Sequence, residues 1–301
     1  MEPSPNQRCG LVAILGAPNA GKSTLVNALV GQKVAIVSPK AQTTRARLMG
    51  LAIEGDAQIL LVDTPGIFDP QRRLDRAMVS AAWGGTEGAD LVALVIDAKA
   101  KFSSRIRALV DQIAALAEPK IVILNKVDVA DKGPLLALAS ELQAMLNPEA
   151  IYFVSAMTGD GVPQLKTDLA KRMPDGPWHF PEDQVSDATD RMLAAEVTRE
   201  QLYLQLHAEL PYASAIETEK YEERKDGSVA IHQQILVGRE TQKAIVLGAK
   251  GARLKEIGQR ARTELAAIIG KPVHLFLHVK VNPRWEEDRS LYRDIGLDWV
   301  D

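Results

Sequence analysis

The stretch G16APNAGKST24 carries residue types and spacing suited to phosphate chemistry. It fits the pattern G-x-x-x-x-G-K-[ST], in which glycines let backbone N–H groups turn toward a phosphate. The ammonium of Lys22 can reach the β- and γ-phosphate oxygens, and the hydroxyl of Ser23 can bind Mg²⁺. An ATPase could carry the same loop, so this stretch alone predicts only a nucleoside phosphate site.

A second such group, D63TPG66, directly follows the apolar run I59LLV62. At a strand end, the carboxylate of Asp63 can hold Mg²⁺ through a water, and the N–H of Gly66 can contact a γ-phosphate. A lone D-x-x-G is typical of an ordinary turn. Its position after a phosphate loop and a strand favours a role in nucleotide binding.

The tetrapeptide N125KVD128 has the chemistry of a guanine reader. Asp128 can accept from the two N–H groups on the guanine edge, and Asn125 can bond the O6/N7 side and its own loop. The stem of Lys126 can lie along the base. Adenine presents the wrong pattern, so these residues favour GTP. The pair S155A156 ends a later strand, where the alanine N–H can meet the guanine O6.

The polar loop S38PKAQTTR45 shows neither helical nor strand periodicity. A hydroxyl that reaches Mg²⁺ only when a γ-phosphate is present would make this loop a switch. Thr44 is the first choice for that hydroxyl and Thr43 the second. The alternative is that both are ordinary loop threonines.

Composition sets wider limits on fold and function. The 301 residues, 46% of them hydrophobic, are enough for two domains with separate cores. A net charge of −3 gives no global reason to expect nucleic acid or membrane, so a basic surface must be local. The single Cys9 and the absence of an apolar signal region in M1EPSPNQR8 favour a reducing cytosol. No apolar run could span a bilayer, so any membrane contact would be peripheral, on the inner face of the cell membrane.

The elements that must position these motifs alternate between strands and helices. Strands are expected near 11–15, 47–54, 57–62, 91–96, 120–124 and 151–154, and helices near 22–30, 102–117, 134–146 and 162–172. E54GD56 predicts a hairpin that makes one edge strand antiparallel, and the remaining units predict a parallel sheet. The pattern therefore predicts an α/β domain over 1–172.

A break in periodicity separates this domain from the rest of the chain. The stretch 173–188 contains three prolines and is interpreted as a linker, although a long functional loop would look similar. The second domain, 189–301, begins with an amphipathic helix predicted to run from Thr189 to Leu210, where Pro211 follows. Strands 213–223 and 229–237, helices 242–248 and 250–270, strand 273–281 and a short helix in the tail complete it. The order α-β-β-α-α-β predicts a smaller α+β domain.

The G248AKG251 turn between two expected helices suits close approach to a nucleic-acid backbone. A lone G-x-x-G is more often a helix C-cap, but this order of elements resembles the prokaryotic type of KH domain, which binds about four nucleotides. From Lys243 to Arg262 there are six basic residues against one acid, Glu256. By itself, such a basic stretch could be an ordinary solvated helix face. Together with the turn, it favours binding of single-stranded RNA. The expected RNA contacts are Gly248, Ala249, Lys250, Gly251 and Arg253.

Taken in order, the five nucleotide motifs resemble those of the translation-factor-related GTPases, and K40AQTTR45 resembles the bacterial Era family. That family joins a GTPase domain to a KH domain, and the two resemblances cover almost the whole chain. The resemblance implies GTP hydrolysis, binding near the 3′ end of small-subunit ribosomal RNA, and assistance in assembling that subunit. It also implies a monomer with pre-ribosomal small subunits as partners and no DNA.

The resemblance extends to individual residues. Ile67 follows D63TPG66 where Ras has a glutamine, and an isoleucine cannot orient water. Related GTPases with an asparagine at the position of Asn19 use it to hold K⁺ near the phosphates, although Asn19 could instead only stabilise its loop. The catalytic residues implied are Asn19, Lys22, Thr44, Asp63 and Gly66, and the Mg²⁺ ligands are Ser23, Thr44 and Asp63. The GTP/GDP contacts implied are Gly16, Ala17, Pro18, Asn19, Ala20, Gly21, Lys22, Ser23, Thr24, Asp63, Thr64, Pro65, Gly66, Ile67, Asn125, Lys126, Asp128, Ser155 and Ala156.

Two classes of function remain open at this point. In the first, the nucleotide state gates RNA binding; in the second, the protein is a constitutive RNA-binding scaffold with a structural nucleotide. Ile67 leaves the second open because it cannot orient a nucleophile. N125KVD128 argues against an ATP-dependent enzyme.

Overall fold

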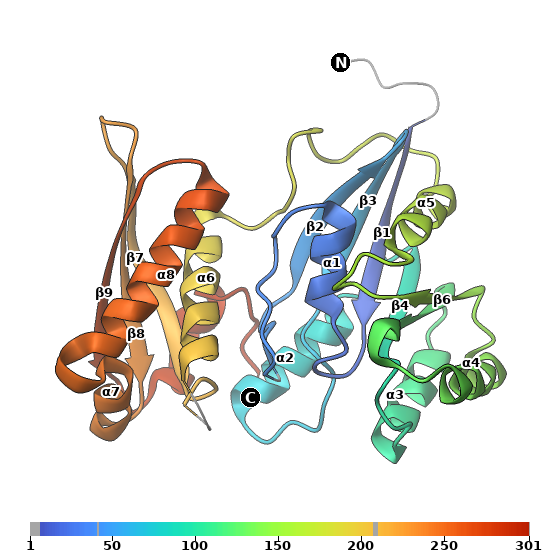
Figure 1. Ribbon diagram of the computed structural model, residues 1–301, viewed down its shortest axis with the longest axis horizontal. Helices are drawn as coiled ribbons and strands as arrows, with labels where there is room; N and C mark the ends of the chain where they lie inside the picture. Colours follow the sequence, from blue (N-terminus) through green and yellow to red (C-terminus); the bar gives the residue numbers. More distant parts are fainter. Residues whose placement is uncertain (1–6, 41, 207–209, 301) are drawn as a thin grey trace. The chain divides into compact units, whose positions relative to one another are not determined.

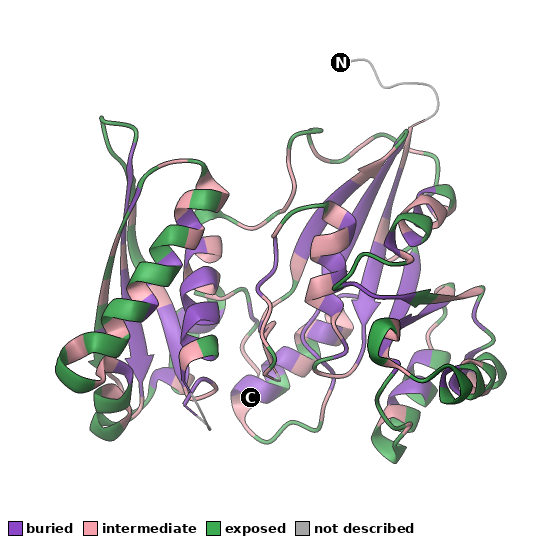
Figure 2. Cartoon of the chain, in the orientation of Figure 1, coloured by how far each residue is buried: buried purple, intermediate pink, exposed green. Residues whose placement is uncertain are grey.

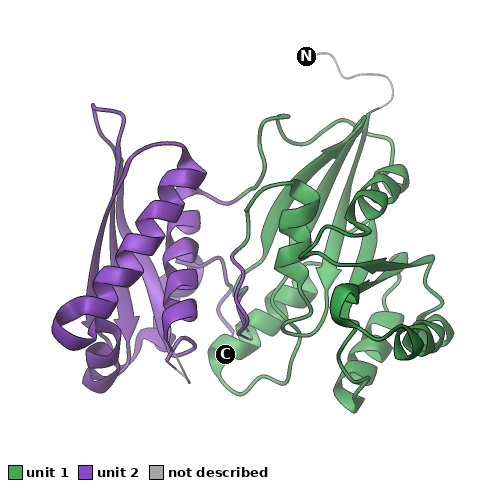
Figure 3. Cartoon of the chain, in the orientation of Figure 1, with its two compact units in different colours: residues 1–35, 44–187 green, residues 36–43, 188–301 purple. Residues whose placement is uncertain are grey.

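The computed structural model describes residues 7–40, 42–206 and 210–300 and divides the chain between two units (Figure 3). The first unit holds the chain up to Ala35 and then Thr44–Asp187. The second holds Ile36–Thr43 and the chain from Ala188 onward. The short segment 36–43 therefore belongs with the C-terminal half although it lies between two elements of the first unit.

The first unit is built on a sheet with strand order β2-β3-β1-β4-β5-β6 (Figure 1). β2 pairs antiparallel to β3 through a turn at Gly55, and the other neighbours pair in parallel, which confirms the predicted mostly parallel sheet with one antiparallel edge strand. The strands are β1 (Arg8–Leu15), β2 (Leu48–Glu54), β3 (Ala57–Asp63), β4 (Leu91–Asp97), β5 (Lys120–Asn125) and β6 (Ala150–Val154).

Helices cover both faces of this sheet. Because successive strand residues point to opposite faces, Val12 and Ile14 share one apolar cluster with α1 and α5, while Ala13 and Leu15 share another with α3 and α4. Figure 2 shows the resulting buried strands. The helices of the unit are α1 (Lys22–Val30), α2 (Arg73–Gly84), α3 (Ser104–Ala114), α4 (Lys132–Leu146) and α5 (Val162–Arg172).

Helix α2 is a correction, because the sequence analysis expects no helix there. Leu74, Met78 and Ala82 do recur at helical spacing and are buried, but charged residues and alanines between them weaken the apolar pattern. The helix also begins without a common N-cap residue. The carboxylate of Asp75 accepts instead from the backbone N–H of Arg72, 3.1 Å away, and satisfies a donor at the helix start.

The parallel strands bring the sequence motifs to one edge of the sheet. β1, β3, β5 and β6 run in the same direction and end at Leu15, Asp63, Asn125 and Val154. The loop after each carboxyl end carries one of the nucleotide motifs. This edge is where open α/β sheets bind ligands.

The stretch expected to be a linker lies along the sheet of the first unit as far as Asp187. The carbonyl of Val185 accepts from the N–H of Leu51 at 2.9 Å. The amide of buried Gln58 donates to the carbonyl of Phe180 at 2.9 Å and accepts from the N–H groups of His179 and Phe180 at 2.9 and 3.1 Å. These bonds explain how a stretch without periodicity becomes ordered, since its backbone groups are satisfied by the sheet and by one side chain.

The second unit has the predicted order α-β-β-α-α-β. Its sheet runs β7-β8-β9, with β7 antiparallel and β9 parallel to β8. The elements are α6 (Asp190–Gln205), β7 (Ser214–Glu223), β8 (Val229–Val237), α7 (Glu240–Leu247), the 3₁₀ turn η2 (Ala249–Gly251), α8 (Ala252–Ile269) and β9 (Val273–Val281). The short helix α9 (Arg289–Asp294) follows a 3₁₀ turn, η3 (Trp285–Glu287), in the tail.

Helix α6 is shorter than expected. It begins after Thr189, whose side chain accepts from the N–H of Met192 as an N-cap, as predicted. It ends at Gln205 rather than Leu210, because Leu206 is extended (φ −100°, ψ 152°). Residues 207–209 of the expected helix lie outside the described residues. The last turn is closed by Lys40, whose ammonium donates to the carbonyls of Tyr203 and Leu206.

The core of the second unit lies between its sheet and the helices α6 and α8, which cover one face of the sheet (Figure 1). Tyr203 of α6 packs with Ile235 of β8, and Val197 packs with Leu265 of α8. Within the part of the chain that the structure describes, we find no helix with the length and apolarity needed to cross a bilayer.

Candidate nucleotide-binding and RNA-binding sites

The loop between β1 and α1 has the backbone of a phosphate cradle. Gly16 and Gly21 have φ of 152° and 91°, a region that favours glycine. A Cβ at Gly16 would lie 2.3 Å from the carbonyl oxygen of Val95, and one at Gly21 would lie 2.2 Å from Nδ2 of Asn125. Both glycines are therefore required by space as well as by conformation. Ala17, Pro18, Asn19 and Ala20 lie between them, and Thr24 follows in the first turn of α1.

Lys22 is buried at the start of α1, as the motif requires. Its Nζ donates to the carbonyls of Gly16 and Ala17, each 3.1 Å away. Burial lowers the pKa of Lys22 to about 8, against an opposing contribution from the Asp63 carboxylate. A phosphate in this loop would supply the negative charge that a buried ammonium lacks, so the residues fit a bound nucleotide.

Three oxygen atoms gather beside the phosphate loop. Oγ of Ser23 lies 2.8 Å from Oγ1 of Thr44 and 2.7 Å from Oδ2 of Asp63, and the last two atoms are 3.1 Å apart. Hydroxyl and carboxylate oxygens are the donors that Mg²⁺ prefers, so this set fits that ion. Thr43 is not part of it, because its hydroxyl bonds Ser38 and the carbonyl of Lys40 instead. Among the described residues, no group of three His, Cys, Asp or Glu side chains offers a rival metal site.

The segment after β3 lies against the phosphate loop. The N–H of Ile67 donates to the carbonyl of Gly16 at 3.1 Å, and the hydroxyl of Thr64 donates to the carbonyl of Ile14 at 2.7 Å. A Cβ at Gly66, which follows Pro65, would lie 2.7 Å from the backbone nitrogen of Pro18, so only glycine fits. The side chain of Ile67 is buried in the apolar cluster with α3 and α4. It is thus unsuited to hold a water molecule by both chemistry and position.

The residues predicted to read guanine form a connected group. Asn125 is buried, and its side chain accepts from the N–H of Ala156 at 3.0 Å and donates to the carbonyl of Ala20 at 2.9 Å. The expected donor to guanine, Ala156, is therefore hydrogen-bonded to Asn125 here. Buried Ser155 stabilises the same turn, since its Oγ accepts from the N–H of Thr158 at 3.2 Å. Asp128 is exposed in the short turn after β5, where a base can reach it.

Sequence reasoning missed one member of this group, Asp97. Nζ of Lys126 donates to Oδ2 of Asp97 at 2.6 Å and to the carbonyl of Asn19 at 2.6 Å. These bonds fix the lysine stem beside the phosphate loop and link three loops at the sheet edge. The position of Asp97 could have indicated this role, because Asp97 ends β4, the one parallel strand of this sheet to which no motif was assigned.

In the second unit, the expected RNA loop has the required backbone. Gly248 and Gly251 have φ of 68° and 77°, and Lys250 between them has φ of 52°. Ala249 and Lys250 are exposed, and α8 begins directly after Gly251, so its first N–H groups face the loop. Arg253 is exposed on the first turn of α8 and donates to the carbonyl of Ile245 at 2.9 Å.

Most of the basic residues counted in this stretch lie on the surface of α8. Lys255, Arg260 and Arg262 are exposed, and Arg260 pairs with Glu256 at 2.6 Å. Ile245 of α7 is also exposed, at 48%, although its neighbour Val246 is fully buried. An exposed apolar side chain beside a glycine loop can contact a base. Sequence reasoning could not separate these two neighbours within one apolar run.

Comparison with known proteins matches both halves of the chain. A family model described as a 50S ribosome-binding GTPase matches residues 11–126, and a model described as a KH domain matches residues 209–286. The chain is 59% identical over 297 residues to GTPase Era of Erythrobacter litoralis, which covers 97% of this chain and 98% of that protein. It is 54% identical to GTPase Era of a Bradyrhizobium species (strain BTAi1), with 99% and 96% covered.

Two solved structures resemble the whole chain. One is a variant of Aquifex aeolicus Era bound to GDP·AlF₄⁻, and the other is Era in complex with MgGDPNP and nucleotides 1506–1542 of 16S ribosomal RNA. Each has a TM-score of 0.91 and 39% identity, with 96% of this chain and 99% of the other chain covered. With these matches and the nucleotide motifs in place, the chain belongs to the Era family of GTPases.

Proposed function

We propose that this GTPase is a nucleotide-controlled switch that binds the 3′ region of small-subunit ribosomal RNA and assists assembly of that subunit. The observation that carries the proposal is the presence, in one chain, of the phosphate-loop and N125KVD128 motifs at one sheet edge and of the G248AKG251 loop at the start of a basic helix. The similar Era structure that holds a 16S ribosomal RNA fragment supports the same partner. An rRNA partner implies action in the cytoplasm, and we propose a monomer.

In this proposal, the nucleotide contacts follow the geometry of the first unit. Ser23, Thr44 and Asp63 hold Mg²⁺, which neutralises charge on the β- and γ-phosphates when bound. Lys22 adds a buried positive charge beside them, and the N–H of Gly66 meets the γ-phosphate. Asp128 reads the guanine edge. Together these groups bind and polarise GTP, and they leave the attacking water to be positioned by a group other than the side chain of Ile67.

The RNA contacts are proposed at the loop between α7 and α8. A Cβ at Gly248 would lie 2.8 Å from Cβ of Arg253, so this glycine lets the loop pack on the first turn of α8. The open space at the missing Cβ of Gly251 lets the backbone lie against sugar and phosphate, and the start of α8 directs N–H groups toward them. Lys250 and Arg253 are exposed and add positive charge, while Ala249 stays small enough not to block the approach. The scale of the site suits a single strand of about four nucleotides.

Aspartates in the glycine loop are expected to weaken RNA binding without affecting GTP turnover. The variant Gly248→Asp with Gly251→Asp adds two negative charges to the loop, and the Cβ at position 248 also disturbs the contact with Arg253. We expect about tenfold weaker RNA binding or more. The measurement is the Kd of the full-length protein for a single-stranded RNA with the 3′-terminal 16S sequence, alongside the GTPase rate.

Gly270→Asp is the control for the Gly251→Asp change in this variant. Gly270 follows α8, has a φ of 70°, and, like Gly251, has open space around its missing Cβ. The control carries the backbone strain and the added charge of Gly251→Asp away from the loop, so it should keep the wild-type RNA affinity. Equal RNA affinity of the double variant and the wild type would exclude the KH loop as the RNA site.

We also propose that K⁺, held by Asn19, substitutes for an arginine finger. Asn19 has φ of 63° at the outer part of the phosphate loop, and Ile67 is buried and apolar, so another group must act on the phosphates. Exchanging KCl for NaCl at constant ionic strength should then slow GTP hydrolysis by about tenfold or more. GDP affinity, measured in both salts, should stay the same. Equal turnover in the two salts would refute the K⁺ role.

A further inference from the structure

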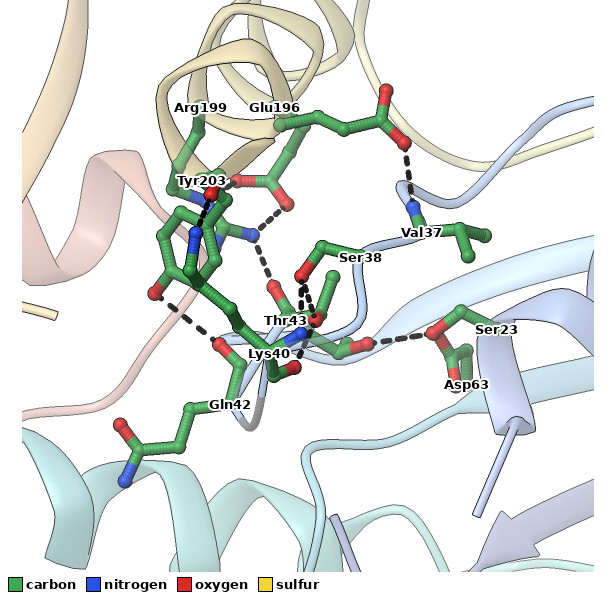
Figure 4. Close-up of polar contacts among 12 residues, drawn as sticks. Ser23, Val37, Ser38, Lys40, Gln42, Thr43, Asp63, Glu196, Arg199 and Tyr203 are labelled. Atoms are coloured by element: carbon green, nitrogen blue, oxygen red, sulfur yellow. Dashed lines mark hydrogen bonds and ion pairs between the residues drawn. The ribbon is translucent and has the colours of Figure 1, made fainter. Parts of the chain in front are cut away.

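The segment 36–43, which precedes Thr44, is attached to helix α6 within the second unit (Figures 3 and 4). The N–H of Val37 donates to the carboxylate of Glu200 at 2.7 Å. Nζ of Lys40 donates to the carbonyl of Leu206 at 2.5 Å and also to that of Tyr203. These bonds join two positions of the segment, Val37 and Lys40, to one helix, so the segment is held against α6.

Among the contacts between α6 and segment 36–43, the one made by Arg199 lies nearest to Thr44 in the sequence. Its Nη2 donates to the carbonyl of Thr43 at 2.5 Å, and its Nε donates to Oε1 of Glu196 at 2.8 Å. Arg199 is 2% exposed, and the central carbon of its guanidinium lies 5.1 Å from the ring centre of Tyr203. Burial alone would lower the pKa of Arg199, but the Glu196 carboxylate outweighs it and raises that pKa, so the side chain stays charged. A buried, charged and paired arginine is a rigid donor.

The bonded carbonyl belongs to the peptide unit that also contains the N–H of Thr44. Since a peptide unit is planar, a hydrogen bond to that oxygen restrains the orientation of the peptide plane that contains the backbone nitrogen of Thr44. The side chain of Thr43 is fixed as well, because its hydroxyl lies 2.8 Å from Oγ of Ser38 and donates to the carbonyl of Lys40 at 2.8 Å. Thr44 itself places its hydroxyl beside Ser23 and Asp63.

We propose that Arg199, oriented by Glu196, is a positioning residue for the metal site: it holds the Thr43–Thr44 peptide so that the Thr44 hydroxyl is available to Mg²⁺. This inference rests on the proposed metal role of Thr44. It assigns a task in the nucleotide site to a helix of the RNA-binding unit. Coupling between two binding events is reciprocal. A triphosphate that draws the Thr44 hydroxyl to Mg²⁺ therefore also favours the conformation in which segment 36–43 is hydrogen-bonded to α6.

The test compares triphosphate and diphosphate affinity in the full-length Arg199→Gln variant. The Thr44 hydroxyl serves only the triphosphate state, so the Kd for GDPNP with Mg²⁺ should rise about tenfold while the Kd for GDP changes less than about twofold. Arg199→Lys keeps one charged donor, so its Kd for GDPNP should lie between those of the wild type and of Arg199→Gln. A residue that only stabilises the fold would change both affinities or neither.

Two further variants keep the result interpretable. Arg191→Gln removes another arginine of α6 that donates to a main-chain carbonyl, that of Thr218 in β7, and it should leave both affinities unchanged. Lys40→Gln removes the bonds that segment 36–43 itself donates to α6, and it should weaken the binding of GDPNP but not of GDP. It tests the proposal independently if Arg199→Gln unfolds. Unchanged GDPNP affinity in a folded Arg199→Gln or in Lys40→Gln would overturn the proposal.

A double-mutant cycle with Thr44→Ala separates this inference from the assignment on which it rests. Thr44→Ala alone should weaken GDPNP, and adding Arg199→Gln should cause little further loss, because both changes remove one interaction. If Thr44→Ala leaves GDPNP affinity unchanged, the metal assignment fails and the positioning role fails with it. If Thr44→Ala weakens GDPNP and Arg199→Gln weakens it equally again in that background, only the positioning role is overturned.

Discussion

Replacing Asp128 by Asn is expected to change the base preference of the protein from guanine to xanthine. The carboxylate of Asp128 is exposed just beyond β5 and can accept from both N–H groups on the guanine edge. An asparagine presents one N–H where an acceptor is needed, so GTP affinity should fall about a thousandfold, as when a site loses a required hydrogen-bonding partner. Xanthine carries a carbonyl at the corresponding ring position, which the asparagine amide can donate to.

The measurement is the Kd of the Asp128→Asn variant for GTP and for xanthosine triphosphate. Asp131→Asn is the matched control, because Asp131 is an exposed acid at the start of α4, close in sequence but outside the motif. The control should keep its preference for GTP. Unchanged GTP affinity in Asp128→Asn would remove the guanine-reading role from this residue.

The gathering of the nucleotide motifs at one sheet edge could be predicted from the sequence because local patterns and the topology of a parallel sheet agree. Lys22, Asp63 and Asp128 each follow an apolar strand, and parallel strands bring their carboxyl ends to one edge. The sequence left Thr43 and Thr44 as alternatives. Only the folded loop separates them, since one hydroxyl lies with Ser23 and the other bonds within its own segment.

The sequence could not predict partnerships between residues far apart in the chain. Asp97 binds Lys126, Gln58 binds the stretch around Phe180, and Arg199 binds the carbonyl of Thr43. None of these pairs produces a periodic or local pattern. Arg199 in particular resembles an ordinary polar residue of an amphipathic helix until the segment before Thr44 is seen against it.

Helix ends were also set by such partnerships. The apolar spacing continues to Leu210, and this favoured a longer α6. The helix ends at Gln205, where Leu206 is extended, and Lys40 satisfies the carbonyls of Tyr203 and Leu206 from a distant part of the sequence. The same lysine thus caps the end of the helix and anchors the segment that leads to Thr44.

We propose that the nucleotide state controls RNA binding. A pathway of contacts supports it within the second unit: segment 36–43 is bonded to α6, Gln201 of α6 donates to Glu264 of α8 at 2.9 Å, and α8 begins at the glycine loop. A change at Thr44 can therefore bias the helix that presents the RNA site. Coupling of this kind is worth a factor of about 5 to 150 in affinity.

The most direct test measures the affinity of the wild-type protein for a single-stranded RNA with the 3′-terminal 16S sequence, first with GDPNP and Mg²⁺ and then with GDP and Mg²⁺. Because the similar Era structure with RNA carries GDPNP, we expect the triphosphate state to bind about thirtyfold more tightly. Crosslinking in each state, followed by sequencing of the captured RNA, identifies the nucleotides bound. Equal affinity and equal targets in the two states would contradict the switch and support a constitutive RNA-binding scaffold.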